Sequence, residues 1–499
     1  MAAVAAMAAC NGERPVVPPP PPPPRSTSHY VSPDGRAAGN GSLTAPWDLP
    51  TALSGGSGRV QPGDTIWLRG GVYLGTYTSV VQGRADAPVV LRAYAGERAI
   101  LDAGRTRQDS TRGDFFVVTG DYTILWGLEF MDSDPVRTVT SRPNLIVNDA
   151  SHTRYINLIV HDGGIGFYTY SNRFDVEVAG CLLYNNGWSV GGEGGGHGLY
   201  VKSDVGPLVL RDNVLFDQFG YGIHAYTDAG DGALINIRLE HNVTFNNGLL
   251  SGSASGANIL VGGFARADAI AATGNLTYFS PGVDAMNVRL GWSRSPVMNG
   301  SLAFQDNYLV GGGVVLEVNR WQQAVVATNT LAGVQPSEVV RLGDSTTAGY
   351  AWTGDQYYRD PADTAWTYHN ATYSFSGWRA ATGLGGSDQA TAATPTVPRV
   401  FVYPNPYEAG RANVIIFNWG RLPTVDVDLS GVLRVGEVFD VRSVLDYFGP
   451  AIASGSYGGG AVTIPIPTGS PPAPIGGSPA PPPPTAPDFA VLVVSRRGS

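Results

Sequence analysis

The sequence predicts an all-β protein that consists of a right-handed parallel β-helix, or solenoid, and a small C-terminal β-sandwich. Three observations support this fold class. Glycine contributes 66 of the 499 residues and hydrophobic residues 43%, a composition that suits many short strands joined by tight turns. A polar residue followed by an apolar run recurs along the middle of the chain, beside runs in which apolar and polar residues alternate. Towards the C-terminus, separate alternating strands replace these repeats.

The chain begins with a short apolar run of small residues, MAAVAAMAAC, and a proline run follows at Pro18–Pro24. This start resembles the end of a bacterial lipoprotein signal, in which Cys10 would carry the lipid. We therefore expect residues 1–28 to be a signal remnant and a stiff Pro-rich linker. The protein would then be exported, as a secreted, extracellular or periplasmic protein or as a cell-envelope lipoprotein whose lipid is its only membrane contact. The alternative is the Ala-rich start of a cytoplasmic protein.

From His29 the chain consists of short β-rich runs separated by Gly, Pro and Asp, such as PGDTIWLRGGVY from Pro62 and PVVLRAYAGERAILDAG from Pro88. These runs resemble the opening of the pectate-lyase-like right-handed β-helix superfamily, where such segments form the N-terminal cap and the first coils. The resemblance continues in weaker form to Asp344. It implies a β-helix over residues 29–344 and a protein that acts on carbohydrate.

A polar column supports the solenoid without reference to any family. Its positions are spaced 22 to 33 residues apart, as expected for coils with insertions in their turns. They are Asn157, Cys181, Asn213, Asn242, Asn275, Asn307 and Asn329. We expect these residues to form a stacked amide ladder that satisfies buried backbone groups. Cys181 then points into the core and is not a nucleophile.

A second column predicts which strand of each coil carries function. Its inward positions are apolar: Phe167, Leu199, Ile223, Ile259, Val288 and Leu316. Since side chains alternate between the two faces of a strand, the neighbours of these residues must point outward. The outward set is Tyr168, Tyr170, His197, Tyr200, Lys202, Tyr221, His224, Tyr226, Arg289, Glu317 and Arg341.

Two further regions follow the predicted solenoid. Residues 345–398 are aromatic and irregular, which suggests a cap or linker over the last coils. Residues 399–499 contain alternating runs such as VFVYPNP and NVIIFNW and predict a β-sandwich with a Pro-rich loop at Pro465–Pro487. This part resembles the accessory β-domains of many carbohydrate-active enzymes.

Charge narrows the range of partners. The net charge of −9 and the pI near 5.3 argue against nucleic-acid binding, which needs a broad basic field. Cys10 and Cys181 are far apart in unlike settings, so we expect neither a disulfide nor a cysteine metal site. A capped solenoid is also expected to be a monomer.

The outward face contains a candidate catalytic cluster. Lys202 is the only lysine in the chain, and adjacent coils about 4.8 Å apart would stack it near His197, Tyr200, His224 and Tyr226. A lysine can act as a base when its pKa is depressed, whereas arginine cannot. The opposing interpretations are a chance surviving lysine and an aromatic ladder that only stabilises the sheet.

The best fit to this cluster is β-elimination in a polymer that contains uronic acid, which needs a base, an acid and a group that neutralises the carboxylate. We assign the base to Lys202 or His224 and the acid to Tyr200 or Tyr226. The neutralising group would be His197 or Arg289. The substrate-binding residues expected around them are Tyr168, Tyr170, Tyr221, Arg289, Glu317 and Arg341.

A calcium ion could also neutralise the carboxylate, and the flanking turns offer oxygen ligands in Glu193, Asp204, Asp228 and Asp231. No spaced calcium motif supports that site, so no cofactor is firmly expected. We therefore favour a polysaccharide lyase or a related epimerase. A glycoside hydrolase, which needs two spaced carboxylates, and a non-catalytic glycan-binding or cell-surface protein remain the alternatives.

Overall fold

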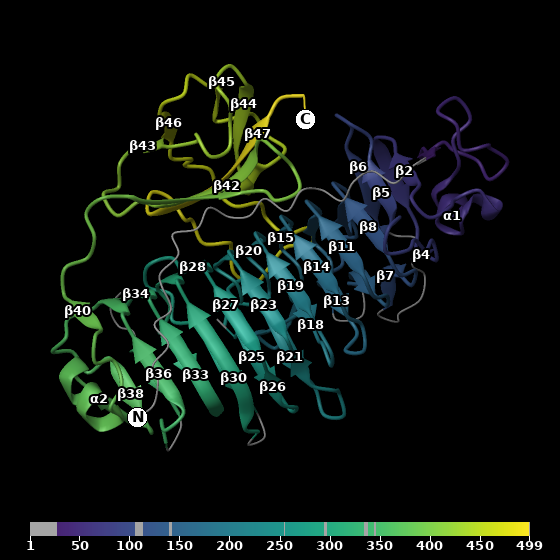
Figure 1. Ribbon diagram of the computed structural model, residues 1–499. Coiled ribbons are helices and arrows are strands. Elements are labelled where there is room, and N and C mark those ends of the chain that lie inside the picture. Colours follow the sequence, from purple (N-terminus) through teal and green to yellow (C-terminus); the bar gives the residue numbers. More distant parts are fainter. Residues whose placement is uncertain are drawn as a thin grey trace.

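The computed structural model describes residues 27–104, 113–138, 142–253, 255–293, 297–333, 338–343 and 346–498. The lipidation site expected at Cys10 lies outside these residues. Three sheets of twelve strands each, parallel except for one antiparallel strand at the end of one sheet, wind into a right-handed β-helix, and a β-sandwich packs on its side (Figure 1). In the described part of the chain, no helix combines the length and the apolar character that crossing a membrane requires.

Each coil contributes one strand to each sheet. Sheet 1 contains β1 (Ser28–Val31), β2 (Thr65–Leu68), β5 (Val89–Ala93), β8 (Thr123–Trp126), β11 (Thr153–Ile156), β14 (Val176–Ala179), β19 (Leu208–Arg211), β23 (Ile237–Glu240), β27 (Ile270–Thr273), β30 (Asn299–Gln305), β33 (Trp321–Ala327) and β36 (Tyr350–Thr353). Sheet 2 contains β4 (Tyr77–Ser79), β7 (Asp114–Val118), β10 (Asn144–Asn148), β13 (Ile165–Thr169), β18 (Leu199–Val201), β21 (Ile223–Thr227), β25 (Ala257–Gly263), β29 (Met286–Trp292), β32 (Val314–Val318), β35 (Glu338–Leu342), β38 (Trp366–Tyr368) and β39 (Ala371–Tyr373). Sheet 3 contains β3 (Gly71–Leu74), β6 (Ala99–Asp102), β9 (Glu129–Met131), β12 (Ile159–His161), β15 (Leu182–Tyr184), β20 (Val214–Phe216), β24 (Val243–Phe245), β28 (Leu276–Tyr278), β31 (Tyr308–Val310), β34 (Thr330–Ala332), β37 (Gln356–Tyr358) and β40 (Gln389–Thr391).

Several short helices and strands lie in the turns and at the start of the β-helix. The helix α1 (Leu49–Leu53) begins at the N-cap Asp48, which accepts a hydrogen bond from the backbone N–H of Thr51, and it packs near β4. The strands β16 (Trp188–Val190) and β17 (Glu193–Gly195) form a hairpin. A small parallel pair, β22 (Leu234–Ile235) and β26 (Ala267–Asp268), extends two of the turns.

The predicted inward column of sheet 2 is confirmed. Phe167, Leu199 and Ile223 are register partners, and the column continues through Ile259, Val288 and Leu316. All six residues are buried in the main hydrophobic core. Stacking like on like lets each coil bury its apolar side chains against the next coil, which is why the repeat is stable only as an array.

The amide ladder is also confirmed from Cys181 onward. The Nδ2 atom of Asn213 donates to Oδ1 of Asn242 at 3.0 Å, and Asn242 donates to Asn275 at 3.0 Å. The same contact continues through Asn307 and Asn329 and ends at Asp355. Cys181 is a buried core residue, and burial raises the pKa of its thiol to about 12.

Asn157 does not belong to this ladder. Leu158 takes the ladder position, where its N–H approaches the Cys181 sulfur at 3.3 Å. Asn157 instead adopts a left-handed backbone conformation with φ of 51°, as Asp212 and His241 do immediately before their own ladder residues. Asparagine suits both the left-handed position before the ladder and the ladder position itself. Alignment by residue type alone therefore placed Asn157 in the ladder, one residue before the correct position.

The solenoid extends further than predicted. Past residue 344, β36, β37 and β38 pair in parallel with the preceding coil, so that the region predicted as cap and linker contains one more turn of the helix. Aromatic Tyr357 and Trp366 fill inward positions there, which hid the aliphatic pattern. The end is then covered by α2 (Phe375–Thr382), whose Phe375 and Trp378 are buried.

Residues 399–498 form the sandwich. One sheet has the order β41 (Arg399–Pro404), β42 (Arg411–Phe417), β47 (Phe489–Arg496), β44 (Val438–Ser443) and β45 (Ala453–Ser456). The strands β43 (Thr424–Val427) and β46 (Val462–Pro465) form the other sheet. Short 3₁₀ turns occur at Gly56–Gly58 in the N-terminal cap and at Val444–Asp446 in the sandwich.

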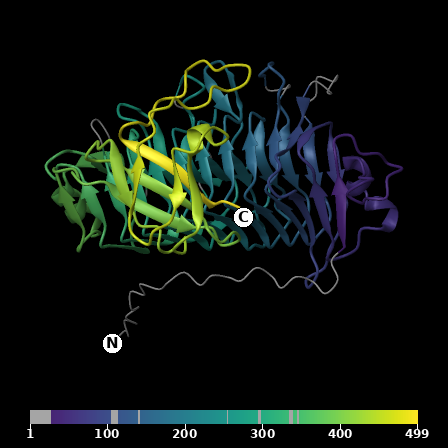
Figure 2. The ribbon, with the colours of Figure 1, turned by 90° about the horizontal axis from the view of Figure 1, so that it is seen from above.

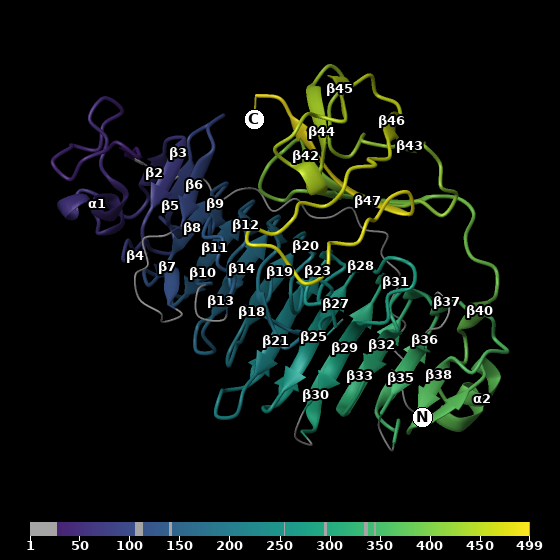
Figure 3. The same ribbon diagram turned by 180° about the vertical axis from the view of Figure 1, so that it is seen from behind.

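The sandwich packs against sheet 3 through an apolar interface (Figures 2 and 3). Phe417 and Phe489 of the sandwich contact Tyr278, whose ring is stacked on that of Phe489 with centroids 4.4 Å apart. The Pro-rich loop also touches the coils, since the carbonyl oxygen of Ile475 accepts hydrogen bonds from Arg137 and Arg142. The sandwich therefore covers sheet 3 and leaves the outward face of sheet 2 away from this interface.

Candidate active site

Sheet 2 brings together most of the side chains predicted to be catalytic. Tyr168 on β13, Tyr200 on β18 and His224 on β21 are register partners on its outward face. We call the following set the sheet 2 cluster: Tyr168, His197, Tyr200, Lys202, Tyr221, His224 and Tyr226. Tyr170 lies at its margin, exposed, with its ring 5.1 Å from that of Tyr168.

An imidazole lies at the centre of the sheet 2 cluster. The ring of His224 stacks on Tyr221 at 4.3 Å and on Tyr226 at 4.6 Å. The ring of His197 lies 4.3 Å from that of His224. Close packing of rings on neighbouring coils explains why these outward residues are largely removed from water, and only 7% of His224 is exposed.

His224 is held as the neutral imidazole. Burial, with additional repulsion from His197 and Lys202, lowers the pKa of His224 well below its usual value near 6.5. Its Nδ1 atom is buried and has no hydrogen-bond partner. A neutral imidazole has one nitrogen with a free lone pair, which is the state that a general base requires.

Lys202 is engaged in an ion pair. Its Nζ lies 2.6 Å from Oδ2 of Asp231 and donates to the Tyr168 hydroxyl at 3.4 Å. It also lies 4.9 Å from the centroid of the Tyr200 ring. Burial by itself would lower the pKa of Lys202, but the hydrogen bond to Asp231, the charge of Asp231 and the interaction with Tyr168 outweigh it and raise the pKa. The expected depressed pKa is not found, and Lys202 is a cation at neutral pH.

Tyr200 keeps its proton. Its hydroxyl donates to Oδ2 of Asp228 at 2.7 Å, and burial together with this carboxylate raises the pKa of Tyr200 above its usual value. Asp228 and Asp231 belong to one turn, in which the backbone N–H of Asp228 donates to Asp231. This turn therefore holds both the phenol and the ammonium group of the cluster.

His197 has a defined proton arrangement. The backbone N–H of Tyr221 donates to Nδ1 of His197 at 3.3 Å, which requires that Nδ1 is unprotonated. Neutral His197 thus has its proton on Nε2, a donor. Gly220 permits this approach, because a Cβ atom there would lie 2.4 Å from the Gly196 carbonyl oxygen and 2.9 Å from Nδ1 of His197.

The predicted binding residues on later coils form a separate group. In the outward column Leu260 follows His224 and is fully buried, so that it divides the sheet 2 cluster from Arg289. Arg289 forms an ion pair with Glu317 at 2.6 Å. Arg341 pairs with Glu338 at 2.6 Å. The alternation that identified Ile259 as inward already implied Leu260 as outward.

The predicted calcium site is not formed. Across the described ranges, no group of three or more His, Cys, Asp or Glu side chains is arranged to hold a metal ion. Asp228 and Asp231 bind Tyr200 and Lys202, while Glu193 is exposed on the β16–β17 hairpin. The sequence identified these carboxylates but assigned them the wrong partners, because nothing local showed that the turn folds back over the lysine.

Comparisons with known proteins agree with the fold. Residues 29–269 match the family model described as the Pel9A-like right-handed β-helix region. Pectate lyase PEL9 of Emericella nidulans is 33% identical over 222 residues, which cover 43% of this chain and 47% of that protein. Pectate lyase L of Thermoclostridium stercorarium is 24% identical over 276 residues, which cover 46% of this chain and 21% of that protein. The chain thus spans less than half the length of these two curated relatives. The crystal structure of pectate lyase Pel9A aligns with 66% of this chain and 80% of its own at 18% identity, with a TM-score of 0.46.

Proposed function

The β-helix of this chain belongs to the pectate-lyase-like right-handed β-helix superfamily, and on that premise we propose that the protein is a polysaccharide lyase. Its substrate would be a polymer that contains uronic acid, bound across the outward face of sheet 2. The observation that carries the proposal is the position of the Tyr200 phenol, whose ring centroid lies 4.9 Å from that of the neutral His224 imidazole and 4.9 Å from the ammonium nitrogen of Lys202.

The proposed reaction is a β-elimination. A base removes the proton from C5 of the uronate, and the electron pair forms a C4=C5 double bond as the C4–O bond breaks. The leaving oxygen then receives a proton from an acid. Because negative charge develops on the uronate carboxylate when the C5 proton leaves, a nearby cation or donor lowers the barrier.

We assign these roles from the protonation states in the cluster. His224 acts as the base, since burial keeps its imidazole neutral and one ring nitrogen therefore has a free lone pair. Lys202 and the Nε2–H of His197 neutralise the carboxylate. Tyr200 retains its proton at neutral pH and serves as the acid, for which its hydroxyl exchanges Asp228 for the leaving oxygen. Lys202 thus changes from a candidate base to a cation that binds the substrate.

The experiment measures new unsaturated uronate by ultraviolet absorbance on alginate, pectate, chondroitin and heparin, each with and without calcium. The lysine role is separated by two variants. Lys202→Arg keeps the charge but cannot accept a proton, so activity should stay within about tenfold, whereas Lys202→Met should lose about a hundredfold or more. His224→Ala should lose about 10²–10⁴-fold. His369→Ala, at an exposed turn outside the cluster, is the matched control.

Four results would contradict the proposal. An equal loss of activity in Lys202→Arg and Lys202→Met would indicate that Lys202, and not His224, is the base. Full activity in His224→Ala would remove His224 from the mechanism. Saturable binding with neither new absorbance nor new reducing ends on any polymer would indicate a glycan-binding protein, and new reducing ends without absorbance would indicate a hydrolase.

We also propose that the protein is exported, because a polymeric substrate does not cross a membrane and therefore has to be met outside it. The lipobox-like run that ends at Cys10 supports this. Expression of the chain in a bacterium with labelled fatty acid, followed by fractionation, should place label on the protein and lose it in Cys10→Ser. Recovery of the unprocessed chain in the cytoplasm would contradict export.

A further inference from the structure

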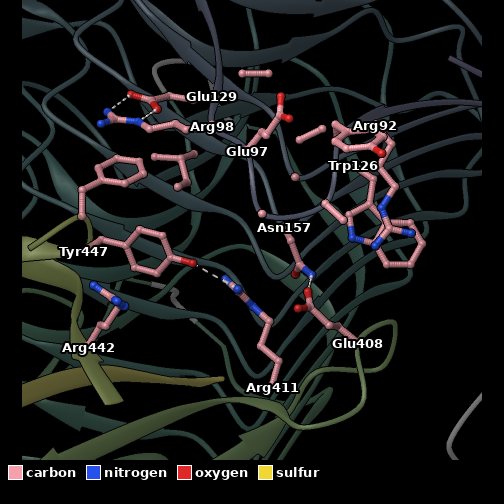
Figure 4. A pocket seen from close by; sticks show the side chains of 18 residues that line it. Arg92, Glu97, Arg98, Trp126, Glu129, Asn157, Glu408, Arg411, Arg442 and Tyr447 are labelled. Atoms are coloured by element: carbon pink, nitrogen blue, oxygen red, sulfur yellow. Dashed lines mark hydrogen bonds and ion pairs between the residues drawn. The ribbon is translucent and has the colours of Figure 1, made fainter. Parts of the chain in front are cut away.

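A cavity lies where the first coils of the β-helix meet the sandwich, remote from the sheet 2 cluster (Figure 4). Its volume is about 470 Å³, within the range of sites that bind small molecules. One wall comes from the segment between β5 and β6 and from Trp126 at the end of β8. The other comes from the sandwich, through Arg411, Arg442 and Tyr447.

Four arginines face this cavity: Arg92, Arg98, Arg411 and Arg442. Arg98 is neutralised by Glu129, since its Nη2 lies 2.7 Å from Oε1 of that residue. Arg442 donates to the carbonyl oxygen of Gly449 and lies 3.8 Å from Asp440. These two guanidinium groups therefore have partners inside the protein.

The other carboxylates around the cavity are also occupied. Glu97 accepts hydrogen bonds from Arg69 and from the backbone N–H of Gly70. Glu408 accepts from Nδ2 of Asn157 at 2.8 Å, and the two side chains meet beside the cavity in Figure 4. Each of these two carboxylates therefore accepts its hydrogen bonds from groups other than Arg92 and Arg411.

Arg411 and Arg92 form no close ion pair, although the charge of Glu408 acts on both of them. Arg411 donates to the Tyr447 hydroxyl at 3.1 Å, and Figure 4 shows its guanidinium group directed towards that hydroxyl. The guanidinium of Arg92 lies over the ring of Trp126 at 4.1 Å. For neither arginine do the described residues place an Asp or Glu oxygen within 4.0 Å. Most of the donors of two cations therefore remain available to a ligand.

The rest of the lining suits a sugar. Aromatic rings line the cavity, and a guanidinium group lies over each of them: Tyr94, Trp126, Tyr447 and Phe448. The C–H groups of a pyranose would pack against the ring surface that these guanidinium groups leave free. A guanidinium group binds a carboxylate through two parallel hydrogen bonds. We propose that this cavity is a second saccharide site, which binds a single carboxylate-bearing sugar unit independently of turnover on sheet 2.

Binding is tested with D-galacturonic acid, D-galactose and inorganic phosphate, by calorimetry and ligand-observed saturation-transfer NMR on the full chain. Galacturonic acid should bind at least tenfold more tightly than galactose or phosphate. Arg411→Gln should weaken its binding at least tenfold. Arg84→Gln, which removes an exposed arginine paired with Asp86 elsewhere, should leave it unchanged.

The same titration with Lys202→Met distinguishes the two sites. Unchanged affinity in Lys202→Met supports the cavity, whereas loss of binding there assigns the ligand to sheet 2 and overturns the inference. Equal affinity for galactose or phosphate, an unaffected Arg411→Gln variant, or no saturable binding would overturn it as well. If Arg411→Gln melts at a lower temperature than the parent, Trp126→Ala removes the stacking face from the helix side and should weaken binding equally.

Discussion

Replacement of Asp231 by Asn tests the electrostatic basis of the candidate site. The change keeps the size of the side chain but removes the carboxylate 2.6 Å from Lys202 Nζ. Exposed ion pairs contribute about 0–1 kcal/mol, whereas removal of one partner of a buried pair destabilises a protein by about 3–5 kcal/mol. The Lys202 side chain is 6% exposed and that of Asp231 is 29% exposed, so this pair lies between the two limits. We expect Asp231→Asn to lower the free energy of unfolding by about 2 kcal/mol at neutral pH.

The same substitution should lower the pKa of Lys202, because it removes the carboxylate that counteracts the effect of burial on that pKa. As the only lysine, Lys202 would give a single side-chain signal in protein with ¹³C-labelled lysine, and its pH titration can be followed directly. In the parent protein the folded pKa is raised. The stabilisation is therefore complete below the unfolded value near 10.5 and is lost as pH rises through the folded pKa.

Urea denaturation at neutral pH measures the loss of stability, and Asp86→Asn at an exposed ion pair is the matched control. An unchanged midpoint together with an unchanged lysine titration would refute the reasoning, because the pair would then not hold the lysine in its charged state.

Three further predictions concern the fold and the buried histidine. Asn275→Leu removes four ladder hydrogen bonds and should lower the free energy of unfolding by about 3–5 kcal/mol, whereas exposed Gln323→Leu should have little effect in the same urea titration. Because the folded pKa of His224 is depressed, its contribution to stability is present above the usual pKa near 6.5 and is lost as pH falls. His224→Phe should therefore make the free energy of unfolding less dependent on pH in the acid range. An unchanged dependence on pH would argue against a neutral histidine. Phe417→Ala should weaken the packing of the sandwich on sheet 3 by about 3–5 kcal/mol. Protease should then cleave the exposed connection at residues 392–398 faster than in the parent, and an unchanged cleavage rate would contradict the role of this interface.

The repeating parts of the fold could be predicted from the sequence, because they depend on a local rule applied many times. Alternation along each strand identified Phe167 and Leu199 as inward and Tyr168 and Tyr200 as outward, and the structure has that register. Asparagine occurs at two adjacent positions of the repeat, the ladder position and the position before it. At Asn157 the same rule therefore misplaced the ladder of the first coil by one residue.

Protonation states could not be predicted in the same way, because they depend on contacts between segments and on burial. The sequence identified Lys202 as exceptional but could not show that the turn after β21 folds over it and places Asp231 at its ammonium group. It also assigned the two carboxylates of that turn to a metal, since the spacing of acidic residues says nothing about which cation they meet.

The sequence by itself determined the β-helix, the face on which its polar aromatic residues gather and most members of that cluster, since the two-residue period of a strand and the length of a coil are properties of neighbouring residues. Only the tertiary structure decided that Lys202 is charged and His224 neutral, and only it formed the cavity between Trp126 and Arg411. The physical reason is that a pKa and a cavity depend on which distant segments pack together and exclude water, and no local period encodes those contacts.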